Sequence, residues 1–184
     1  MESKLFTPVT FGPLTLRNRT IRSAAFESMC PGNAPSDMLL DYHRSVAAGG
    51  IGMTPVAYAA VTQSGLSFDR QLWMRPEIIP GLRRLTDAIH AEGAAAGIQL
   101  GHCGNMSHKS ICGCMPVGAS SGFNLYSPTF VRGLRADELP EMARAYGRSV
   151  NLAREAGFDS VEIHAGHGYL ISQFLSPSTN HRTD

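Results

Sequence analysis

Two histidines and a tyrosine lie close together near the end of this chain of 184 residues. His164, His167 and Tyr169 follow an apolar segment, residues 161–163, and the glycines between them allow a sharp turn. Two imidazoles can hydrogen-bond one oxygen of a ligand, while a phenol, with an ordinary pKa of about 10, is protonated at neutral pH and can supply a proton. The spacing therefore predicts a site that binds an oxygen atom and donates a proton.

A second polar residue follows the same pattern earlier in the chain. Gln99 lies in a short apolar segment, residues 98–100, and His102 follows it after one glycine. A carboxamide offers both hydrogen-bond donors and an acceptor, so it suits the polar edge of a ring ligand. The alternative is a buried glutamine that bonds only to the backbone.

The elements that position these residues alternate between strand-like and helix-like segments, which predicts parallel β–α–β units. The expected strands cover residues 20–25, 51–56, 98–100 and 160–164, and the expected helices cover residues 37–48, 80–92 and 137–157. A short helix or turn is expected over residues 170–175, and residues 101–135 form a long connection rich in Gly, Ser and Pro. Loops of that length inside compact domains are usually functional.

Individual residues set some of these boundaries. Ser36 and Asp137 are the expected N-caps of the first and third helices, because short polar side chains accept from exposed helical N–H groups. Pro55 is expected to end the second strand or to mark an irregularity in it, since proline cannot donate to the ladder.

Four strands with three intervening helices amount to half of a (β/α)₈ barrel, which typically needs about 250 residues. Such barrels carry their chemistry at the C-terminal ends of the strands, where the two histidines would lie. An open doubly wound sheet is the alternative, but the first turn after a strand lacks G-x-G-x-x-G, which argues against a dinucleotide site of that type. Residues 1–184 are therefore expected to be the N-terminal half of a single barrel domain.

The composition excludes several other classes of protein. A net charge of +1 gives no electrostatic reason to expect nucleic acid or a membrane surface as a partner. No apolar run approaches about 20 residues, and the first residues lack the pattern of a secretory signal, so the cytoplasm is the expected location. Free thiols are expected at all four cysteines, which are Cys30, Cys103, Cys112 and Cys114.

Several blocks of this sequence resemble the Old Yellow Enzyme family of FMN-dependent ene-reductases and NADH:flavin oxidoreductases. The most specific is His164-Ala-Gly-His-Gly-Tyr-Leu170, followed by Phe174-Leu-Ser-Pro177. Weaker blocks occur in the family's order, at Leu5-Phe-Thr-Pro8, Leu14-Thr-Leu-Arg-Asn-Arg19 and Ile98-Gln-Leu-Gly-His102. The resemblance implies a TIM barrel with an N-terminal hairpin, bound FMN, and NAD(P)H as the reductant.

The resemblance also implies roles for individual residues. His164 and His167 would bind the oxygen of an electron-withdrawing group on a small-molecule substrate, and Tyr169 would donate a proton to the α-carbon. The residues that would bind or line the flavin are Ser23, Ala24, Ala25, Tyr58, Gln99 and His164. Phe26 stands where many relatives have a Thr or Cys near the flavin, a departure that bears on substrate preference.

The function that these expectations favour is reduction of an activated C=C bond, such as that of an enone or a dienoyl thioester. One alternative is a metal-dependent barrel hydrolase in which His102, His164 and His167 bind zinc with an open position. Another is a non-catalytic, truncated half-barrel that pairs with another chain. A homo-oligomer is compatible with the sequence, and an iron–sulfur cluster is possible only in a part beyond residue 184.

Overall fold

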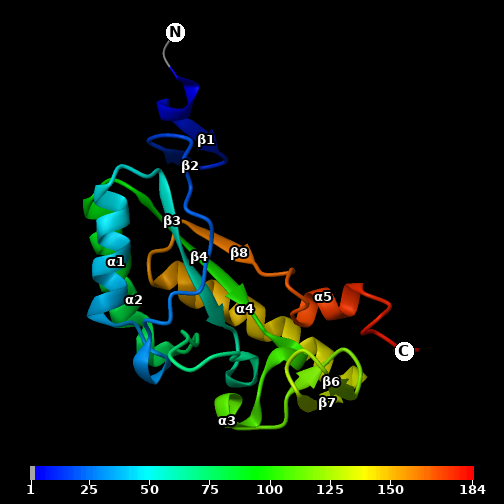
Figure 1. The fold of residues 1–184 in the computed structure, drawn as a ribbon. Helices are drawn as coiled ribbons and strands as arrows, with labels where there is room; N and C mark the ends of the chain where they lie inside the picture. The colour runs from blue at the N-terminus through cyan, green and yellow to red at the C-terminus, as the bar shows by residue number, and fades with distance from the viewer. Residues whose placement is uncertain (1–2) are drawn as a thin grey trace.

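The computed structural model describes residues 3–184, and its centre is a parallel sheet of three strands in the order β3-β4-β8 (Figure 1). These strands are β3 (Met53–Ala60), β4 (Ala95–Gly101) and β8 (Ser160–Ile163). An antiparallel hairpin of β1 (Val9–Phe11) and β2 (Leu14–Leu16) precedes the sheet, as expected, and lies at the N-terminal end of the molecule in Figure 1.

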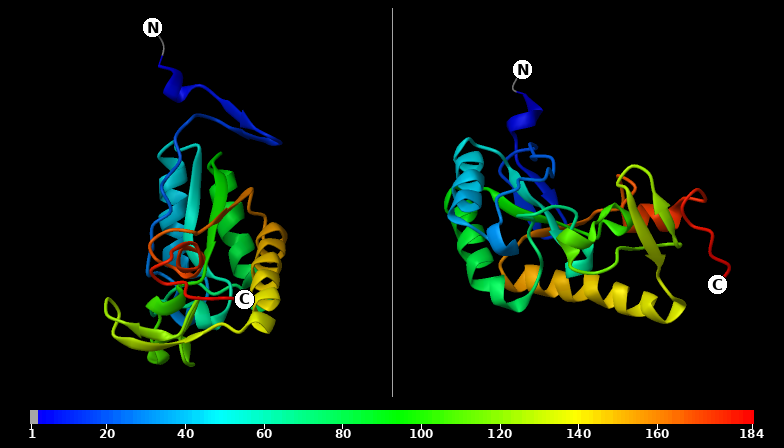
Figure 2. Two further views of the ribbon diagram at one scale, coloured as in Figure 1. Left: turned by 90° about the vertical axis from the view of Figure 1, so that its right-hand side faces the viewer. Right: turned by 60° about the horizontal axis from the view of Figure 1, so that its bottom comes forward.

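Three helices cover one face of this sheet, as both views in Figure 2 show. They are α1 (Asp37–Ala48), α2 (Ile79–Ala91) and α4 (Leu139–Glu155), close to the predicted ranges. Their apolar sides form one core with the alternate residues Ile98 and Leu100 of β4, which are fully buried. Because side chains alternate along a strand, Gln99 and Gly101 face the opposite side of the sheet.

Only one of the two predicted helix caps is correct. The side chain of Ser36 accepts a hydrogen bond of 3.1 Å from the N–H of Leu39 at the start of α1. Asp137 does not cap α4, because its carboxylate is taken by the guanidinium of Arg135 at 3.1 Å. Glu138 accepts from the Arg135 N–H at 2.8 Å instead, and a turn of 3₁₀ helix precedes α4.

The prediction of a strand over residues 20–25 is wrong. Within this segment only Ile21 forms a β-bridge, to Met53 of β3. The N–H of Arg22 still donates to the carbonyl of Met53 at 3.0 Å, after which the chain leaves the sheet. Side chains rather than a backbone ladder hold the residues that follow.

Pro55 lies inside β3 and does not end it, so the first of the two alternatives predicted for this proline is wrong. The carbonyl of Pro55 accepts from the Arg22 guanidinium at 2.9 Å, so its backbone groups face away from β4, toward the edge that residues 22–27 leave open. A proline there removes no ladder bond, because the missing N–H would have had no strand to pair with. An irregularity does occur slightly later, between Val56 and Ala59.

The long connection over residues 101–135 is more ordered than its composition suggests. It contains α3 (Lys109–Cys112) and a second small sheet of β5 (Val117–Gly118), β6 (Gly122–Asn124) and β7 (Thr129–Gly133) in the order β5-β7-β6. The chain then returns through β8 to α5 (Leu170–Leu175). The buried Gln173 of α5 joins the two regions, because its amide donates to the carbonyl of Gly168 at 2.6 Å and to Asn105 Oδ1 at 2.9 Å.

Two compositional expectations can be compared with the described residues. All four cysteines are free thiols, as predicted, although the sulfurs of Cys112 and Cys114 are only 3.7 Å apart. Within residues 3–184, none of the helices has the length and apolar character needed to span a membrane.

Candidate active site

The structure brings the predicted histidines and tyrosine together just beyond β8. Nδ1 of His167 lies 3.1 Å from Nε2 of His164, and the two rings meet nearly edge to face. The Tyr169 ring lies 4.7 Å from that of His164 and 6.2 Å from that of His167, measured between centroids. All three side chains therefore contribute to one polar cluster.

The backbone of this turn explains how closely spaced residues converge. The N–H of His164 donates to the carbonyl of Leu100 at 2.8 Å, which extends the pairing with β4 and fixes the first imidazole. His167 and Gly168 then have left-handed backbones, with φ of +56° and +69°. This conformation is uncommon outside glycine, although histidine adopts it more readily than most residues. It reverses the chain and directs His167 back toward His164.

The two imidazoles differ in environment and in hydrogen bonding. Burial lowers the pKa of His164, and the neighbouring His167 lowers it further, so this ring is neutral at neutral pH. The N–H of Gly166 donates to Nδ1 of His164 at 3.3 Å, so the proton of His164 is on Nε2 and points at His167. His167 is exposed, and its Nε2–H is directed away from that bond and remains for a ligand.

Tyr58 and Gly101 support the cluster from the adjacent strands. The buried Tyr58 ring packs edge-on against His164 at 5.6 Å, and its hydroxyl lies 2.8 Å from the Ser67 hydroxyl. A Cβ on Gly101 would lie 2.9 Å from the Tyr58 ring and 3.2 Å from Cβ of His164. This position therefore has room only for glycine, and the three strands meet closely here.

Gln99 lies on the same face of the sheet as this cluster. It is 9% exposed, and its Nε2 donates to the Glu162 carboxylate on β8 at 2.6 Å. Its carbonyl oxygen and second N–H are left for a ligand. The backbone-bonded glutamine considered as the alternative is thus not what the structure shows.

His102 does not join the cluster, so the zinc site proposed for the hydrolase alternative is wrong. It is fully buried, its Nδ1 accepts from the N–H of Gly104 at 3.0 Å, and its Nε2 bonds the Ser64 hydroxyl at 3.1 Å. Burial lowers the pKa of His102 to about 4. In the part of the chain that the structure describes, no group of three or more His, Cys, Asp or Glu side chains is placed to hold a metal ion.

The predicted flavin-lining residues Ser23, Ala24 and Ala25 lie on the irregular segment after the single bridge at Ile21. Ser23 and Ala25 are exposed and Ala24 is half-buried, so this segment presents small side chains at the surface. Its conformation depends on the residues that flank it.

Glu27, which sequence reasoning missed, anchors this segment to the sheet. Its side chain is only 4% exposed, with Oε1 3.0 Å from Arg22 Nη1 and 3.3 Å from Nε2 of the buried His43. Its Oε2 accepts from the N–H of Ala57, which the irregularity in β3 leaves without a ladder partner, at 3.2 Å. One carboxylate therefore positions both residues 23–26 and the part of β3 that carries Tyr58. The sequence did offer one sign of this role, because Glu27 is an acidic residue in a segment of otherwise small and apolar residues.

We expect Glu27→Gln to lower the free energy of unfolding by about 3 kcal/mol, because it leaves the half-buried Arg22 without a charged partner. Urea denaturation measures the change. Glu141→Gln is the matched control, since Glu141 pairs with Arg144 and Arg148 at the surface, where such pairs contribute little. Equal stability losses in the two variants would contradict the anchoring role.

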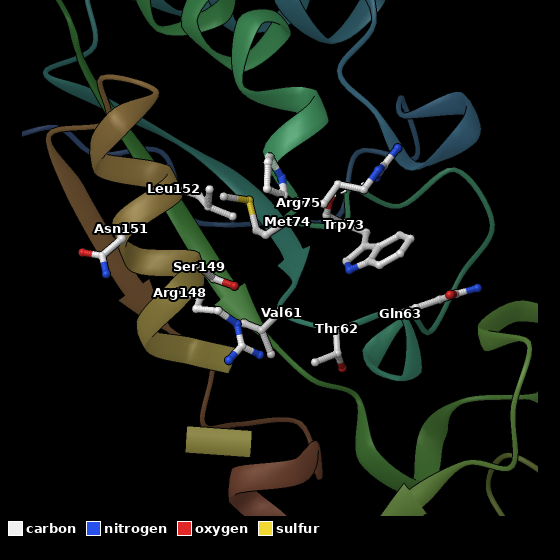
Figure 3. Close-up of a pocket in the computed structure, with 11 residues that line it drawn as sticks. Val61, Thr62, Gln63, Trp73, Met74, Arg75, Arg148, Ser149, Asn151 and Leu152 are labelled. Atoms are coloured by element: carbon white, nitrogen blue, oxygen red, sulfur yellow. Dashed lines mark hydrogen bonds between the residues drawn. The ribbon is translucent and has the colours of Figure 1, made fainter. Parts of the chain in front are cut away.

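A cavity of about 460 Å³ opens beside Tyr169, with Ser67, Phe68, His108 and Ser127 among its lining residues. A second cavity, of about 430 Å³, lies between α4 and the loop after β3, where Trp73, Arg75 and Arg148 contribute to its walls (Figure 3). None of the predicted site residues lines the cavity between α4 and the loop after β3. Of these two cavities, the one beside Tyr169 therefore adjoins the candidate site.

Residues 4–184 match the model of the NADH:flavin oxidoreductase / NADH oxidase family. The chain is 42% identical over 180 residues to 4,4'-dithiodibutanoate disulfide reductase of Rhodococcus erythropolis, which covers 98% of this chain and 45% of that protein. It is 36% identical over 189 residues to NADPH dehydrogenase of Bacillus subtilis, covering 100% of this chain and 54% of the relative. The chain thus spans about half the length of these relatives.

Solved structures give the same result for the fold. An old yellow enzyme homologue from Zymomonas mobilis superposes with a TM-score of 0.91 at 28% identity, over 99% of this chain and 54% of that one. Morphinone reductase in complex with tetrahydroNAD superposes with a TM-score of 0.90 at 28% identity, over 100% of this chain and 55% of the other. The sheet and helices described above are therefore part of a (β/α)₈ barrel.

Proposed function

Since the chain belongs to the NADH:flavin oxidoreductase / NADH oxidase family, we propose that residues 1–184 form the N-terminal half of one FMN-binding barrel domain. The protein takes hydride from NAD(P)H and reduces an activated C=C bond in a small molecule. The observation that carries this proposal is the convergence of His164, His167 and Tyr169 beyond β8. A cytoplasmic location is part of the proposal, and the four free thiols support it because they suit a reducing compartment.

The residues on this face of the sheet fit a flat flavin ring. Gly101 puts no side chain between Tyr58 and His164, where a Cβ would crowd both, the small residues of the 23–25 segment allow close approach, and Gln99 retains a free carbonyl oxygen. The residues that would hold FMN are Ser23, Ala24, Ala25, Tyr58, Gln99 and His164. When bound, FMN stores two electrons from NAD(P)H and delivers them as a hydride.

The chain's own groups then act on the substrate. The Nε2–H groups of His164 and His167 bind the oxygen of the electron-withdrawing group and stabilise the negative charge that develops on it, the His164 proton then being shared between His167 Nδ1 and that oxygen. The Tyr169 ring lies close to both imidazoles, and its hydroxyl gives its proton to the α-carbon. The names of the relatives include a disulfide reductase and a metal reductase, so the choice of an alkene as the acceptor rests on this site and not on the names.

An absorption spectrum of the protein after reconstitution with FMN tests the cofactor assignment. We expect a visible flavin band that persists through gel filtration and that disappears on anaerobic addition of NADH or NADPH. An enone added afterwards should restore the band as it is reduced. A protein that stays colourless after reconstitution would contradict the proposal, as would a flavin band that neither nicotinamide bleaches.

A further inference from the structure

Aromatic and apolar side chains form much of the lining of the cavity beside Tyr169. Phe68 and Tyr126 line it together with Tyr169, and Met106 and Ile111 add apolar side chains to the lining. Phe68 stacks on Phe26 with centroids 4.7 Å apart and an angle of 23° between the rings, so its orientation is fixed from behind. A cavity of about 460 Å³ with such walls suits a planar ligand of one or two rings.

A paired histidine and serine form a polar spot in the same cavity. Nε2 of His108 lies 2.6 Å from Oγ of Ser127, and both residues line the cavity with Tyr169. Ser127 is 9% exposed, and its hydroxyl also lies 3.3 Å from the carbonyl of Met106, an acceptor that competes for its proton. No group within residues 3–184 bonds Nδ1 of His108, so this nitrogen is left to donate to or accept from a ligand.

The charge of the cavity limits what this polar spot can bind. Asp69 is the acidic member of the lining, and no Lys or Arg is found among the described residues that line it. A carboxylate or phosphate on the ligand would meet a negative charge without a compensating cation. A neutral hydroxyl meets no such penalty and can bond Nδ1 of His108 in either tautomer, whereas a neutral carbonyl oxygen can bond it when Nδ1 carries the proton.

We propose that the cavity binds a flat, neutral ligand whose second oxygen, remote from the activated double bond, hydrogen-bonds to His108 and Ser127. This inference rests on the proposed function, because it takes Tyr169 as the group beside the reacting double bond. The oxygen at the reacting end belongs to His164 and His167, so the His108–Ser127 pair is a separate recognition point that selects among substrates.

Matched enones test the proposal in the FMN-loaded protein. The probes are 4-phenylbut-3-en-2-one and its 4-hydroxyphenyl, 3-hydroxyphenyl and 4-carboxyphenyl analogues. We expect His108→Leu and Ser127→Ala to lower kcat/KM for at least one hydroxyphenyl probe by about three- to tenfold, the loss of one neutral hydrogen bond, with the phenyl probe unchanged. The carboxyphenyl probe should be the poorest substrate of the wild type. Taking variant-to-wild-type ratios for each probe cancels the electronic effect of the substituent.

Binding of the saturated ketones 4-(4-hydroxyphenyl)butan-2-one and 4-phenylbutan-2-one, followed by calorimetry, gives a readout that needs no turnover. The controls are Ser121→Ala, which lies near β6 but lines a different cavity, and His90→Gln, on the outer helix α2. Equal losses for the phenyl and hydroxyphenyl probes in both variants would overturn the proposal, as would no loss for either hydroxyphenyl probe. Failure of the wild type to reduce the phenyl probe would instead count against the proposed function.

Discussion

Tyr169→Phe is expected to slow reduction of an alkene by about 10²- to 10⁴-fold, the usual contribution of one positioned proton donor. The variant keeps the ring that packs against Tyr58 and His164 and loses only the hydroxyl. Reduction of the flavin by NAD(P)H needs no proton from this group and should keep its rate. Stopped-flow measurement of the reductive and oxidative half-reactions separates the two steps.

The control for this prediction is Tyr146→Phe on α4. The Tyr146 hydroxyl is buried without a hydrogen-bond partner among the described residues and lies on the helical side of the sheet, so its removal should change neither half-reaction. If Tyr169→Phe reduced the alkene as fast as wild type, another group would have to supply the proton.

His164→Ala or His167→Ala should each lower the rate of alkene reduction by about 10²- to 10³-fold, comparable to the loss of one oxyanion donor. Binding of para-substituted phenols, which place an oxygen against the same donors, should weaken in parallel. Titration of the visible spectrum with such phenols measures the second effect without turnover. His164 also packs against Tyr58, so His164→Asn, which keeps an N–H donor, separates loss of donation from loss of packing.

The pH dependence provides a further check on these histidines. Burial and the neighbouring His167 lower the pKa of His164 below its ordinary value of about 6.5. The His164 imidazole is therefore neutral at neutral pH and becomes protonated only in more acidic solution, so phenol binding should change with pH only there. His181→Ala is the control, since His181 is exposed on the C-terminal segment. Equal effects of the His164 and His181 substitutions on phenol binding would contradict the role of His164.

The helices and the position of the histidine cluster could be predicted from the sequence because both depend on local patterns. Apolar residues at helical spacing give α2 and α4 a buried side, and Ser36 caps α1 through a residue three positions away. His164, His167 and Tyr169 lie within one turn at the end of an apolar strand, so their neighbourhood follows from the chain itself.

Most of the wrong predictions have the opposite character, since they involve partners distant in sequence; the exception is the Asp137 cap, which fails because Arg135, two residues away, binds its carboxylate. The segment after Ile21 forms no strand because Glu27 ties it to Ala57 and His43, 30 and 16 residues further along. Pro55 is tolerated within β3 because its backbone faces the edge that this segment leaves without a paired strand, so the missing N–H breaks no ladder bond. The prediction of a three-histidine zinc site is wrong because the His102 side chain bonds Ser64 in another loop instead of facing His164 and His167.

The amino-acid order alone thus determined which residue types stand at the ends of the strands and the turn that brings His164 to His167. Only the tertiary structure decided which other side chains share the site, because burial of Glu27 and pairing of His108 with Ser127 depend on segments that meet through long connections. A local pattern sets the backbone of a few residues, whereas the energy of a buried polar group depends on partners that only the complete fold brings within hydrogen-bonding distance.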